Sequence, residues 1–356
     1  MPKVVLTGGG TAGHVTPNLA LLPELYKRGF EVFYIGSKNG MEVDLVRETG
    51  LPYFSVSAGK LRRYFDIKNI SDTGRILKGF LQSIKILKKI KPDVVFSKGG
   101  FVTSPVVWAS WLLKIPIVLH ESDITPGLAN KLSLPFAGIV CVSFPETKEC
   151  LSGKNTVVTG IPIRQELFGG DAATGRKLCG FTDRRPVMMI IGGSQGSQTI
   201  NGVIRKGLQA FLNSFQVCHI CGKGGIDENL SKLSGYRQFE YVKAELPHLF
   251  AMSDIIISRA GATTLFEIVA LKKLNILVPL GKKASRGDQI LNAKSFEKHG
   301  LSKVITEEDL TVDSLIAACR EVLENKDLYY ENMKKTEYSD STAKIADIIQ
   351  CVIEQK

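Results

Sequence analysis

The chain has 356 residues, 44% of them hydrophobic and 23% charged, a composition that excludes a disordered or fibrous protein. Lys and Arg outnumber Asp and Glu by 46 to 35. The resulting net charge of +11 favours an anionic partner, such as nucleic acid, a phosphorylated substrate or an acidic membrane surface, although solubility alone would also account for it. At the usual prior of roughly 150 residues per domain, two domains are expected.

The cysteines and the apolar runs indicate the compartment. The seven cysteines are scattered and odd in number, which is typical of a reducing compartment and not of a disulfide framework. Cys218 and Cys221 have CxxC spacing, but they fall in an expected strand, where they would face opposite sides. We expect a cytoplasmic protein, because the N-terminus carries no secretory signal and no apolar run reaches the ~18 residues of a membrane span.

Strand-like segments rich in β-branched residues alternate with helical patterns from end to end. The expected strands are 4–6, 32–35, 53–56, 94–97, 117–120, 139–143, 157–158, 187–191, 216–220, 239–242, 255–258 and 276–279. The expected helices include 17–28, 102–113, 198–212 and 341–354. This alternation predicts an α/β protein with two doubly wound parallel sheets.

Gly and Pro interrupt the pattern at 160–164, which indicates a domain boundary. We therefore expect an N-terminal domain at 1–160 and a C-terminal domain at 165–340. A last helix within 341–356 can pack back on the N-terminal domain.

Two segments predict a buried strand that turns through glycines into a helix. They are 187–201, VMMIIGGSQGSQTIN, and the beginning of the chain, 4–16. Such a turn directs free backbone N–H groups and the positive end of a helix dipole to one point, which suits phosphate. Because ligands of open parallel sheets bind outside the carboxyl ends of the strands, two similar halves with a cleft between them are expected.

The first glycine turn, GGGTAG at 8–13, fits the GxGxxG dinucleotide fingerprint. A dehydrogenase also needs an acidic residue at the end of the second strand, and that strand ends in Gly36-Ser37-Lys38. The nicotinamide interpretation is therefore disfavoured. His14 follows the turn directly, where an imidazole can act as a general base. A capping or packing histidine is the alternative.

A third strand, turn and helix is expected at 258–267, SRAGATTLFE. Glu267 can accept hydrogen bonds from sugar hydroxyls there, or it can form a capping box with Thr264. No Asp-x-Asp pair and no His, Cys and Asp cluster has metal-ligand spacing, so neither a metal nor a cofactor is expected. A bound diphosphate would be neutralised by helix N-termini and by arginines such as Arg164.

Residues 75–91, RILKGFLQSIKILKKIK, predict a basic amphipathic helix. One interpretation places it on an anionic membrane. The other is an ordinary surface helix with its apolar face in the core.

Seven motifs, in order along nearly the whole chain, resemble glycosyltransferase family 28, and within it the MurG family of cell-wall N-acetylglucosaminyltransferases. They are TGGGTAGHVTP at 7–17, KGGFVTSPVVWAS at 98–110, HESDITPGLANK at 120–131, TGIPIR at 159–164, GGSQGSQTIN at 192–201, SRAGATTLFE at 258–267 and RGDQILNA at 286–293. The resemblance implies a GT-B fold, in which two Rossmann-like domains face a cleft. The N-terminal domain would bind the lipid-linked acceptor and contact the membrane, and the C-terminal domain would bind UDP-GlcNAc.

The resemblance also implies the reaction. It is the inverting transfer of GlcNAc from UDP-GlcNAc to the 4-hydroxyl of the muramoyl unit of undecaprenyl-diphospho-muramoylpentapeptide (lipid I to lipid II). Such an enzyme serves peptidoglycan biosynthesis, and with it cell wall biogenesis, cell shape and cell division. It is peripheral on the cytoplasmic face of the cell membrane. Its partners would be UDP-GlcNAc, lipid I and the anionic membrane surface, with no nucleic acid.

By motif, the resemblance implies His14 as the catalytic base. The substrate-binding residues that it implies are Thr11, Ala12 and Gly13, facing donor and acceptor; Arg164 and Ser194 at the donor, with Ser194 on the diphosphate; Val242 at the uracil; Ala262, Thr263 and Thr264 along the diphosphate and ribose; Glu267 at the ribose; and Gln289 at the GlcNAc hydroxyls. One further position, Asp123, departs from the family pattern, because many members have Asn there in an HExN motif. An acid can accept a hydrogen bond from an acceptor or GlcNAc hydroxyl but cannot donate one as an amide does.

Three other functions compete with this interpretation. A nicotinamide-dependent oxidoreductase lacks its ribose acid and does not explain the second glycine-rich half. A UDP-GlcNAc 2-epimerase is also a two-domain α/β protein and needs no lipid acceptor. A pure binding module would bind UDP without turnover.

Overall fold

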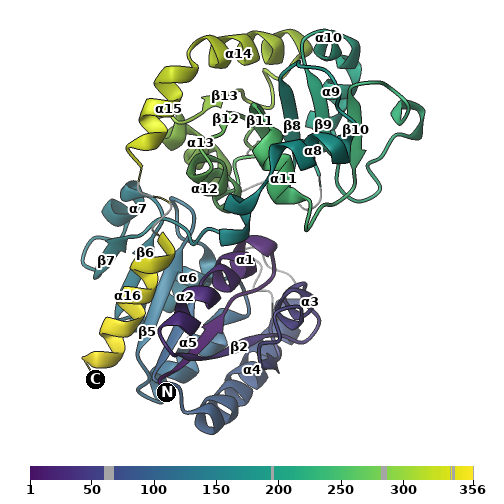
Figure 1. The fold of residues 1–356 in the computed structure, drawn as a ribbon. Helices are drawn as coiled ribbons and strands as arrows, with labels where there is room; N and C mark the ends of the chain where they lie inside the picture. Colours follow the sequence, from purple (N-terminus) through teal and green to yellow (C-terminus); the bar gives the residue numbers. More distant parts are fainter. Residues whose placement is uncertain (60–67, 194–195, 282–286, 337, 339–340, 356) are drawn as a thin grey trace. The chain divides into compact units, whose positions relative to one another are not determined.

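The computed structural model describes residues 1–59, 68–193, 196–281, 287–336, 338 and 341–355, with the side chains of residues 68–72 excepted (Figure 1). The chain forms two compact units, each built on its own parallel sheet. Unit 1 consists of Met1–Ile163 and Ser339–Lys356, and unit 2 consists of Arg164–Tyr338.

Unit 1 contains a seven-stranded parallel sheet with strand order β3-β2-β1-β4-β5-β6-β7. The strands are β1 (Lys3–Thr7), β2 (Glu31–Ser37), β3 (Tyr53–Val56), β4 (Val94–Ser97), β5 (Ile117–Glu121), β6 (Ile139–Val142) and β7 (Thr156–Val158). The helices are α1 (Ala12–Ala20), α2 (Leu22–Lys27), α3 (Glu42–Arg47), α4 (Lys68–Ile90), α5 (Thr103–Leu112), α6 (Leu128–Ser133), α7 (Pro145–Cys150) and α16 (Ser341–Glu354), with a 3₁₀ turn at η1 (Leu134–Phe136).

Both faces of this sheet are buried, as is usual when helices connect parallel strands. Successive residues of β1 point to opposite faces: Val4 and Leu6 pack with α2 and α16, whereas Val5 packs with α4 and α5. Helix α16 packs on the first of these faces through Ile345 and Ile349, which are both fully buried. The last helix of the chain is therefore part of the core of unit 1.

Unit 2 contains a six-stranded parallel sheet with strand order β10-β9-β8-β11-β12-β13. The strands are β8 (Val187–Ile191), β9 (Gln216–Ile220), β10 (Tyr236–Phe239), β11 (Ile255–Ser258), β12 (Leu274–Leu277) and β13 (Lys303–Val304). The helices are α8 (Ala172–Cys179), α9 (Gln198–Lys206), α10 (Leu208–Leu212), α11 (Leu246–Met252), α12 (Ala262–Ala270), α13 (Asp288–Lys298), α14 (Val312–Glu324) and α15 (Lys326–Lys334), with 3₁₀ turns at η2 (Gln165–Gly169) and η3 (Glu228–Leu230).

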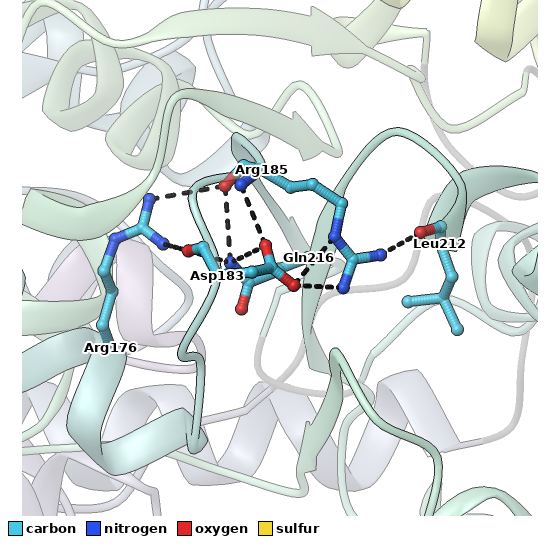
Figure 2. Close-up of polar contacts among 5 residues, drawn as sticks. All are labelled: Arg176, Asp183, Arg185, Leu212 and Gln216. Carbon is cyan, nitrogen blue, oxygen red and sulfur yellow. Dashed lines mark hydrogen bonds and ion pairs between the residues drawn. The ribbon is translucent and has the colours of Figure 1, made fainter.

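A polar network fixes the segment between α8 and the amino end of β8 (Figure 2). Gln216 Nε2 donates to the backbone oxygen and to Oδ1 of Asp183, each at 2.9 Å. Arg185 Nε donates to Asp183 Oδ2 at 2.9 Å, and its guanidinium also donates to the Leu212 backbone oxygen. The hydrogen bonds from Arg185 lower the pKa of the Asp183 carboxyl. Because this network lies at the amino ends of the strands, it belongs to the scaffold and not to the glycine turns at the other ends.

The α/β class and the two parallel sheets are confirmed, but several boundaries differ from the expected ones. The strand expected at 239–242 is β10, three residues earlier, and it is an edge strand whose polar residues hid it from a hydrophobicity pattern. The strand expected at 276–279 is β12, which begins at Leu274 and ends at Leu277. It ends before Pro279, which has no N–H to continue the ladder. The helix expected at 198–212 is broken at Gly207 into α9 and α10.

The first helix also begins earlier than expected, at Ala12 in place of residue 16 or 17. Pro17, which resembled a helix start, lies inside α1. The predicted helix at 75–91 likewise begins earlier, since α4 spans Lys68–Ile90. Nowhere in the described parts of the chain is a helix both long and apolar enough to cross a membrane.

Candidate active site

Each sheet has a point at which the strand order reverses, and these are the places where open parallel sheets bind ligands. In unit 1 the reversal lies between β1 and β4, and in unit 2 it lies between β8 and β11. Of the described residues expected at the substrates, 11–14 follow β1, and 262–264 and 267 follow β11, beside these two points. The topology therefore gathers them at one edge of each sheet.

In unit 1 the structure brings Thr11 and His14 together at the start of α1. Thr11 occupies the N-cap position, but its hydroxyl does not cap the helix. Thr11 Oγ1 instead lies 3.0 Å from Nδ1 of the half-buried His14. Ala12 and Gly13 form the first turn of the helix between them. The early start of α1 therefore holds the imidazole on a regular element and not in a loop.

The glycine turn before this helix already contains an anion, the carboxylate of Glu42. Glu42 is fully buried at the start of α3 and accepts from Gly10 N–H at 3.3 Å. It also accepts from the backbone N–H of Ser37 at 3.0 Å and from Ser37 Oγ at 2.5 Å. At Gly10 this corrects the expectation that the turn offers free amides to phosphate, because that amide binds a side chain of the protein.

We expect Glu42→Gln to lower the free energy of unfolding by about 2 kcal/mol or more, because an amide NH₂ would then face buried N–H donors. Urea denaturation of the full chain measures this change. Asp44→Asn is the matched control, since Asp44 is an exposed acid on the same helix and should change stability by no more than about 0.5 kcal/mol. Equal stability of the Glu42→Gln and native proteins would show that the carboxylate does not hold the turn.

The loops after β4 and β5 complete the site of unit 1. Gly100 has φ of 95°, and a Cβ at this position would overlap the carbonyl oxygen of Gly9, so only glycine lets the second loop lie against the first. After β5, the half-buried Asp123 donates its backbone N–H to Glu121 Oε1 at 3.0 Å. Asp123 therefore lies at the carboxyl edge of the sheet, in a loop held by a buried acid.

In unit 2 the second glycine turn lies between β8 and α9. Gly196 has φ of 72° and lies so close to the Cys221 carbonyl oxygen that a Cβ would overlap it. Ser197 caps α9 by accepting from the Ile200 N–H at 3.3 Å. Ser194, expected at the diphosphate, falls outside the described residues. The N-terminus of α9 nevertheless lies at the switch point, where a helix dipole favours an anion.

Arg164 and Glu267 form a bidentate ion pair in unit 2. Arg164 Nε donates to Oε1 at 2.8 Å, and Nη2 donates to Oε2 at 3.1 Å. Burial alone would lower the pKa of Arg164, but the charge and hydrogen bonds of Glu267 raise it. Because the pair is neutral overall, Arg164 does not bring the uncompensated charge to a diphosphate that the sequence suggested. It keeps further N–H donors beside the carboxylate.

The pair also corrects the capping box expected between Thr264 and Glu267. The N-cap residue of α12 is Gly261, so Thr264 lies inside the first turn and Glu267 lies one turn further on. Glu267 is only 4% exposed, and both of its oxygens accept from Arg164. The carboxylate therefore stabilises an arginine and not a helix end.

The remaining expected residues lie at the same edge of unit 2. Ala262 and Thr263 begin α12, directly after the loop that follows β11. Val242 is buried in the loop after β10, three residues beyond the end of the strand. Gln289 lies in the first turn of α13 and accepts from the Leu280 N–H at 3.0 Å through Oε1. Among the described residues, no group of three or more His, Cys, Asp or Glu could hold a metal ion.

Sequence reasoning missed the buried charges that organise unit 1. Glu42 and Lys98 are 0% and 1% exposed. One signal was present, because Glu42 occupies the apolar face of a short helix, four residues before the buried Val46. Gly10, a partner of Glu42, is 32 residues away and Ser122, the partner of Lys98, is 24 residues away, so spacing alone could not identify these contacts.

Comparison with known proteins extends over the whole chain. Residues 4–142 match the model of the glycosyltransferase family 28 N-terminal domain, and residues 187–352 match that of the family 28 C-terminal domain. A relative from Clostridium botulinum (strain 657 / Type Ba4) is 55% identical over 98% of this chain and 99% of its own. Its name is UDP-N-acetylglucosamine–N-acetylmuramyl-(pentapeptide) pyrophosphoryl-undecaprenol N-acetylglucosamine transferase.

Two solved structures share the fold. MurG of Acinetobacter baumannii superposes with a TM-score of 0.73 at 24% identity, covering 98% of this chain and 99% of that one. UDP-GlcNAc 2-epimerase of Neisseria meningitidis, bound to UDP-GlcNAc, gives 0.68 at 15% identity, with coverage of 98% and 99%. At these identities the likeness concerns the fold alone, so the choice between transferase and epimerase depends on the family match.

Proposed function

We propose that this chain, which belongs to glycosyltransferase family 28, transfers N-acetylglucosamine from UDP-N-acetylglucosamine to the 4-hydroxyl of the muramoyl unit of undecaprenyl-diphospho-muramoylpentapeptide. The anomeric carbon inverts, and the product serves peptidoglycan synthesis. The match to the Clostridium botulinum transferase supports the substrates. The structural observation that carries the proposal is the Thr11–His14 pair at the strand-order reversal of unit 1.

His14 is the general base of the proposed reaction. Its imidazole removes the proton of the muramoyl 4-hydroxyl as that oxygen forms a bond to the anomeric carbon. For Nε2 to accept this proton, Nδ1 must carry a hydrogen, and Thr11 Oγ1 lies 3.0 Å away to accept it. In this proposal the threonine hydroxyl accepts from Nδ1 and so stabilises the tautomer that the chemistry requires.

Unit 2 receives the leaving group. As the bond from the anomeric carbon to the diphosphate oxygen breaks, negative charge grows on UDP, and preorganised N–H donors stabilise that charge. The N-termini of α9 and α12 supply such donors at the carboxyl edge of the sheet. We place Ser194, Ala262, Thr263 and Thr264 along the diphosphate and ribose. The Arg164–Glu267 pair then presents oxygen acceptors and N–H donors to the ribose.

Val242 and Gln289 complete the donor site in this proposal. The backbone of the Val242 loop holds the uracil, and Gln289 binds GlcNAc hydroxyls. The Gln289 side chain already accepts from a backbone N–H, which leaves its NH₂ group to donate. Thr11, Ala12 and Gly13 face both donor and acceptor in this proposal, and Asp123 accepts from a hydroxyl of the acceptor or of GlcNAc.

An acceptor-dependence assay tests the function. The chain is incubated with UDP-GlcNAc, with and without a lipid-linked muramyl-peptide analogue, and free UDP is measured. We expect UDP release only when the acceptor is present. Conversion of UDP-GlcNAc to its C2 epimer without acceptor would support the epimerase instead, and UDP binding without any turnover would support a binding module.

We also propose that α4 contacts an anionic membrane surface from the cytoplasmic side. The helix presents two apolar strips: Phe80 and Leu87 pack into the core, whereas Leu77 and Leu81 are 60% and 59% exposed. The alternative of an apolar face in the core therefore holds for the first strip, and we propose the membrane alternative for the second. An open hollow of about 450 Å³ is lined by Gly74, Leu77, Lys78, Leu81, Gln82 and Lys85. Exposed leucines flanked by lysines suit an interface of acyl chains and acidic headgroups.

Leu77→Glu combined with Leu81→Glu is expected to weaken binding to vesicles of phosphatidylglycerol and phosphatidylcholine by about tenfold or more, because two apolar side chains no longer enter the bilayer. Vesicle sedimentation measures the change. Leu328→Glu is the matched control, since Leu328 is a 62% exposed leucine of unit 2 and should leave binding unchanged. Equal binding of the double variant and the native chain would refute this contact surface.

A further inference from the structure

Two fully buried polar side chains hold the backbone at the start of the glycine turn of unit 1. Tyr34, on β2, donates its hydroxyl hydrogen to the Gly8 backbone oxygen at 2.9 Å. Asn18, on α1, donates through Nδ2 to the Thr7 backbone oxygen at 3.2 Å and to Tyr34 Oη at 3.3 Å. Both residues are 0% exposed. The proposed reaction gives neither of them a chemical role.

The chemistry of the groups fixes the direction of these hydrogen bonds. A backbone carbonyl can only accept, so Asn18 must turn its NH₂ group toward Thr7. The single hydroxyl hydrogen of Tyr34 must go to the Gly8 carbonyl, and the hydroxyl oxygen then accepts from Asn18. One chain of hydrogen bonds therefore links α1, β2 and the carboxyl end of β1.

The same turn lies against the backbone of His14. A Cβ at Gly8 would overlap the His14 carbonyl oxygen and would lie 2.9 Å from Asn18 Nδ2, so α1 packs directly on Gly8. His14 and Asn18 are four residues apart on α1, which places them on the same face of the helix. A shift of Gly8 or of Asn18 would therefore move the backbone that carries the imidazole.

Helix α1 lacks two of the usual internal supports of a helix N-terminus. Pro17 lies inside the helix and has no N–H, so the helical hydrogen bond from residue 17 to the carbonyl of residue 13 cannot form. Thr11 is the N-cap residue, but its side chain does not cap the helix. The turn that carries His14 therefore depends on contacts from outside the helix, and Asn18 and Tyr34 supply them.

We propose that Asn18 and Tyr34 are positioning residues that place the His14 imidazole for proton removal, through the backbone of Thr7 and Gly8. This inference rests on the proposed function, because it takes His14 as the general base. A base acts only within hydrogen-bond reach of its proton, and a displacement of about 1 Å can lower the rate by about 100-fold. Loss of either side chain should therefore lower kcat and leave nucleotide binding unchanged.

Two tyrosines give a matched test, because the same substitution removes one hydroxyl from each of two neighbouring strands. Tyr53, on β3, stacks on Tyr34 with ring centroids 5.9 Å apart, but its hydroxyl donates to the Ser37 backbone oxygen, outside the glycine turn. We expect Tyr34→Phe to lower kcat about tenfold, with the Kd for UDP unchanged, and Tyr53→Phe to keep kcat within about twofold of native. A native kcat for Tyr34→Phe, or an equal loss in both variants, would overturn the proposal.

Asn18→Leu tests the second residue. Leucine has the same branching, and the Thr7 carbonyl keeps the hydrogen bond that it accepts from the Lys98 backbone N–H at 2.9 Å. We expect kcat to fall about tenfold while the urea unfolding midpoint stays close to native. Addition of Tyr34→Phe should cost no more than about a further threefold, because both residues act through one chain of hydrogen bonds. Independent losses, which multiply to about 100-fold, would contradict this shared role.

A measurement on the His14 ring needs no turnover. Histidine labelled with ¹⁵N gives NMR signals from the five histidines of the chain, and His14→Ala identifies the His14 signals by their loss. We expect these signals to shift in Tyr34→Phe and Asn18→Leu but not in Tyr53→Phe. Unchanged His14 signals in the first two variants would overturn the proposal, even if kcat falls.

If the native chain transfers no GlcNAc, the proposed function fails. The His14 signals still test the positioning by Asn18 and Tyr34 in that case.

Discussion

His14→Ala is expected to lower turnover by about 10²–10⁴-fold while UDP affinity stays within about twofold of native, because the imidazole acts on the acceptor hydroxyl and not on the nucleotide. Acceptor-dependent UDP release measures the rate, and calorimetric titration measures UDP binding. The two substrates meet different units in the proposed reaction, and His14 belongs to unit 1. This split between rate and nucleotide affinity separates a base from a residue that merely stabilises the fold.

The matched control for this variant is His299→Ala. His299 is an exposed histidine of unit 2 whose Nδ1 bonds the Ser295 backbone oxygen, and its loss should leave turnover nearly unchanged. Native stability of His14→Ala in urea would exclude a folding defect. A near-normal rate for His14→Ala would remove this residue from the base role.

Glu267→Gln is expected to raise the KM for UDP-GlcNAc by about 100-fold, because it replaces one acceptor oxygen with an NH₂ donor and leaves Arg164 without its counter-charge. The Glu267 side chain is 6% exposed and that of Arg164 is 27% exposed, so solvent screens the loss only in part. Titration with UDP measures the same effect without acceptor. The KM for the lipid-linked acceptor should change little.

Glu321→Gln is the control for the charge change. Glu321 pairs with Lys303 at the surface of unit 2, with 48% and 31% of their side chains exposed, and such pairs contribute little. The combination of Arg164→Met with Glu267→Met separates binding from folding, since it leaves no unpaired charge. If UDP binds Glu267→Gln as tightly as it binds the native chain, Glu267 is not a donor-site residue.

Most of the fold could be predicted because its strands are short apolar runs separated by helical patterns. Those runs are buried on both faces, so hydrophobicity alone marks them. β10 was misplaced because an edge strand carries polar residues such as Arg237 and Gln238, while the apolar Val242 lies beyond its end. The start of α1 was missed because Ala12-Gly13 continues a glycine turn, whereas Pro17 resembled the first residue of a helix.

The site residues that lie in a sequence motif could be predicted. The contacts between charged groups far apart in the sequence could not. His14 and Glu267 stand directly in strand–turn–helix patterns. Glu267 and its partner Arg164 are 103 residues apart, and Glu42 and the Gly10 amide are 32 residues apart. The spacing of neighbouring residues therefore cannot predict either contact. A single sequence shows an acid on a helix, but it does not show which distant group neutralises it.

The linkage formed by the native chain tests the transfer most directly. UDP-GlcNAc labelled in the sugar is incubated with the lipid-linked muramyl-peptide analogue, and the product is analysed by NMR and mass spectrometry. We expect one GlcNAc joined in β configuration to the muramoyl 4-hydroxyl for each UDP released, without any nicotinamide. Label that remains on the nucleotide as a C2 epimer, or UDP released without a new glycosidic bond, would contradict a glycosyl transfer by this chain.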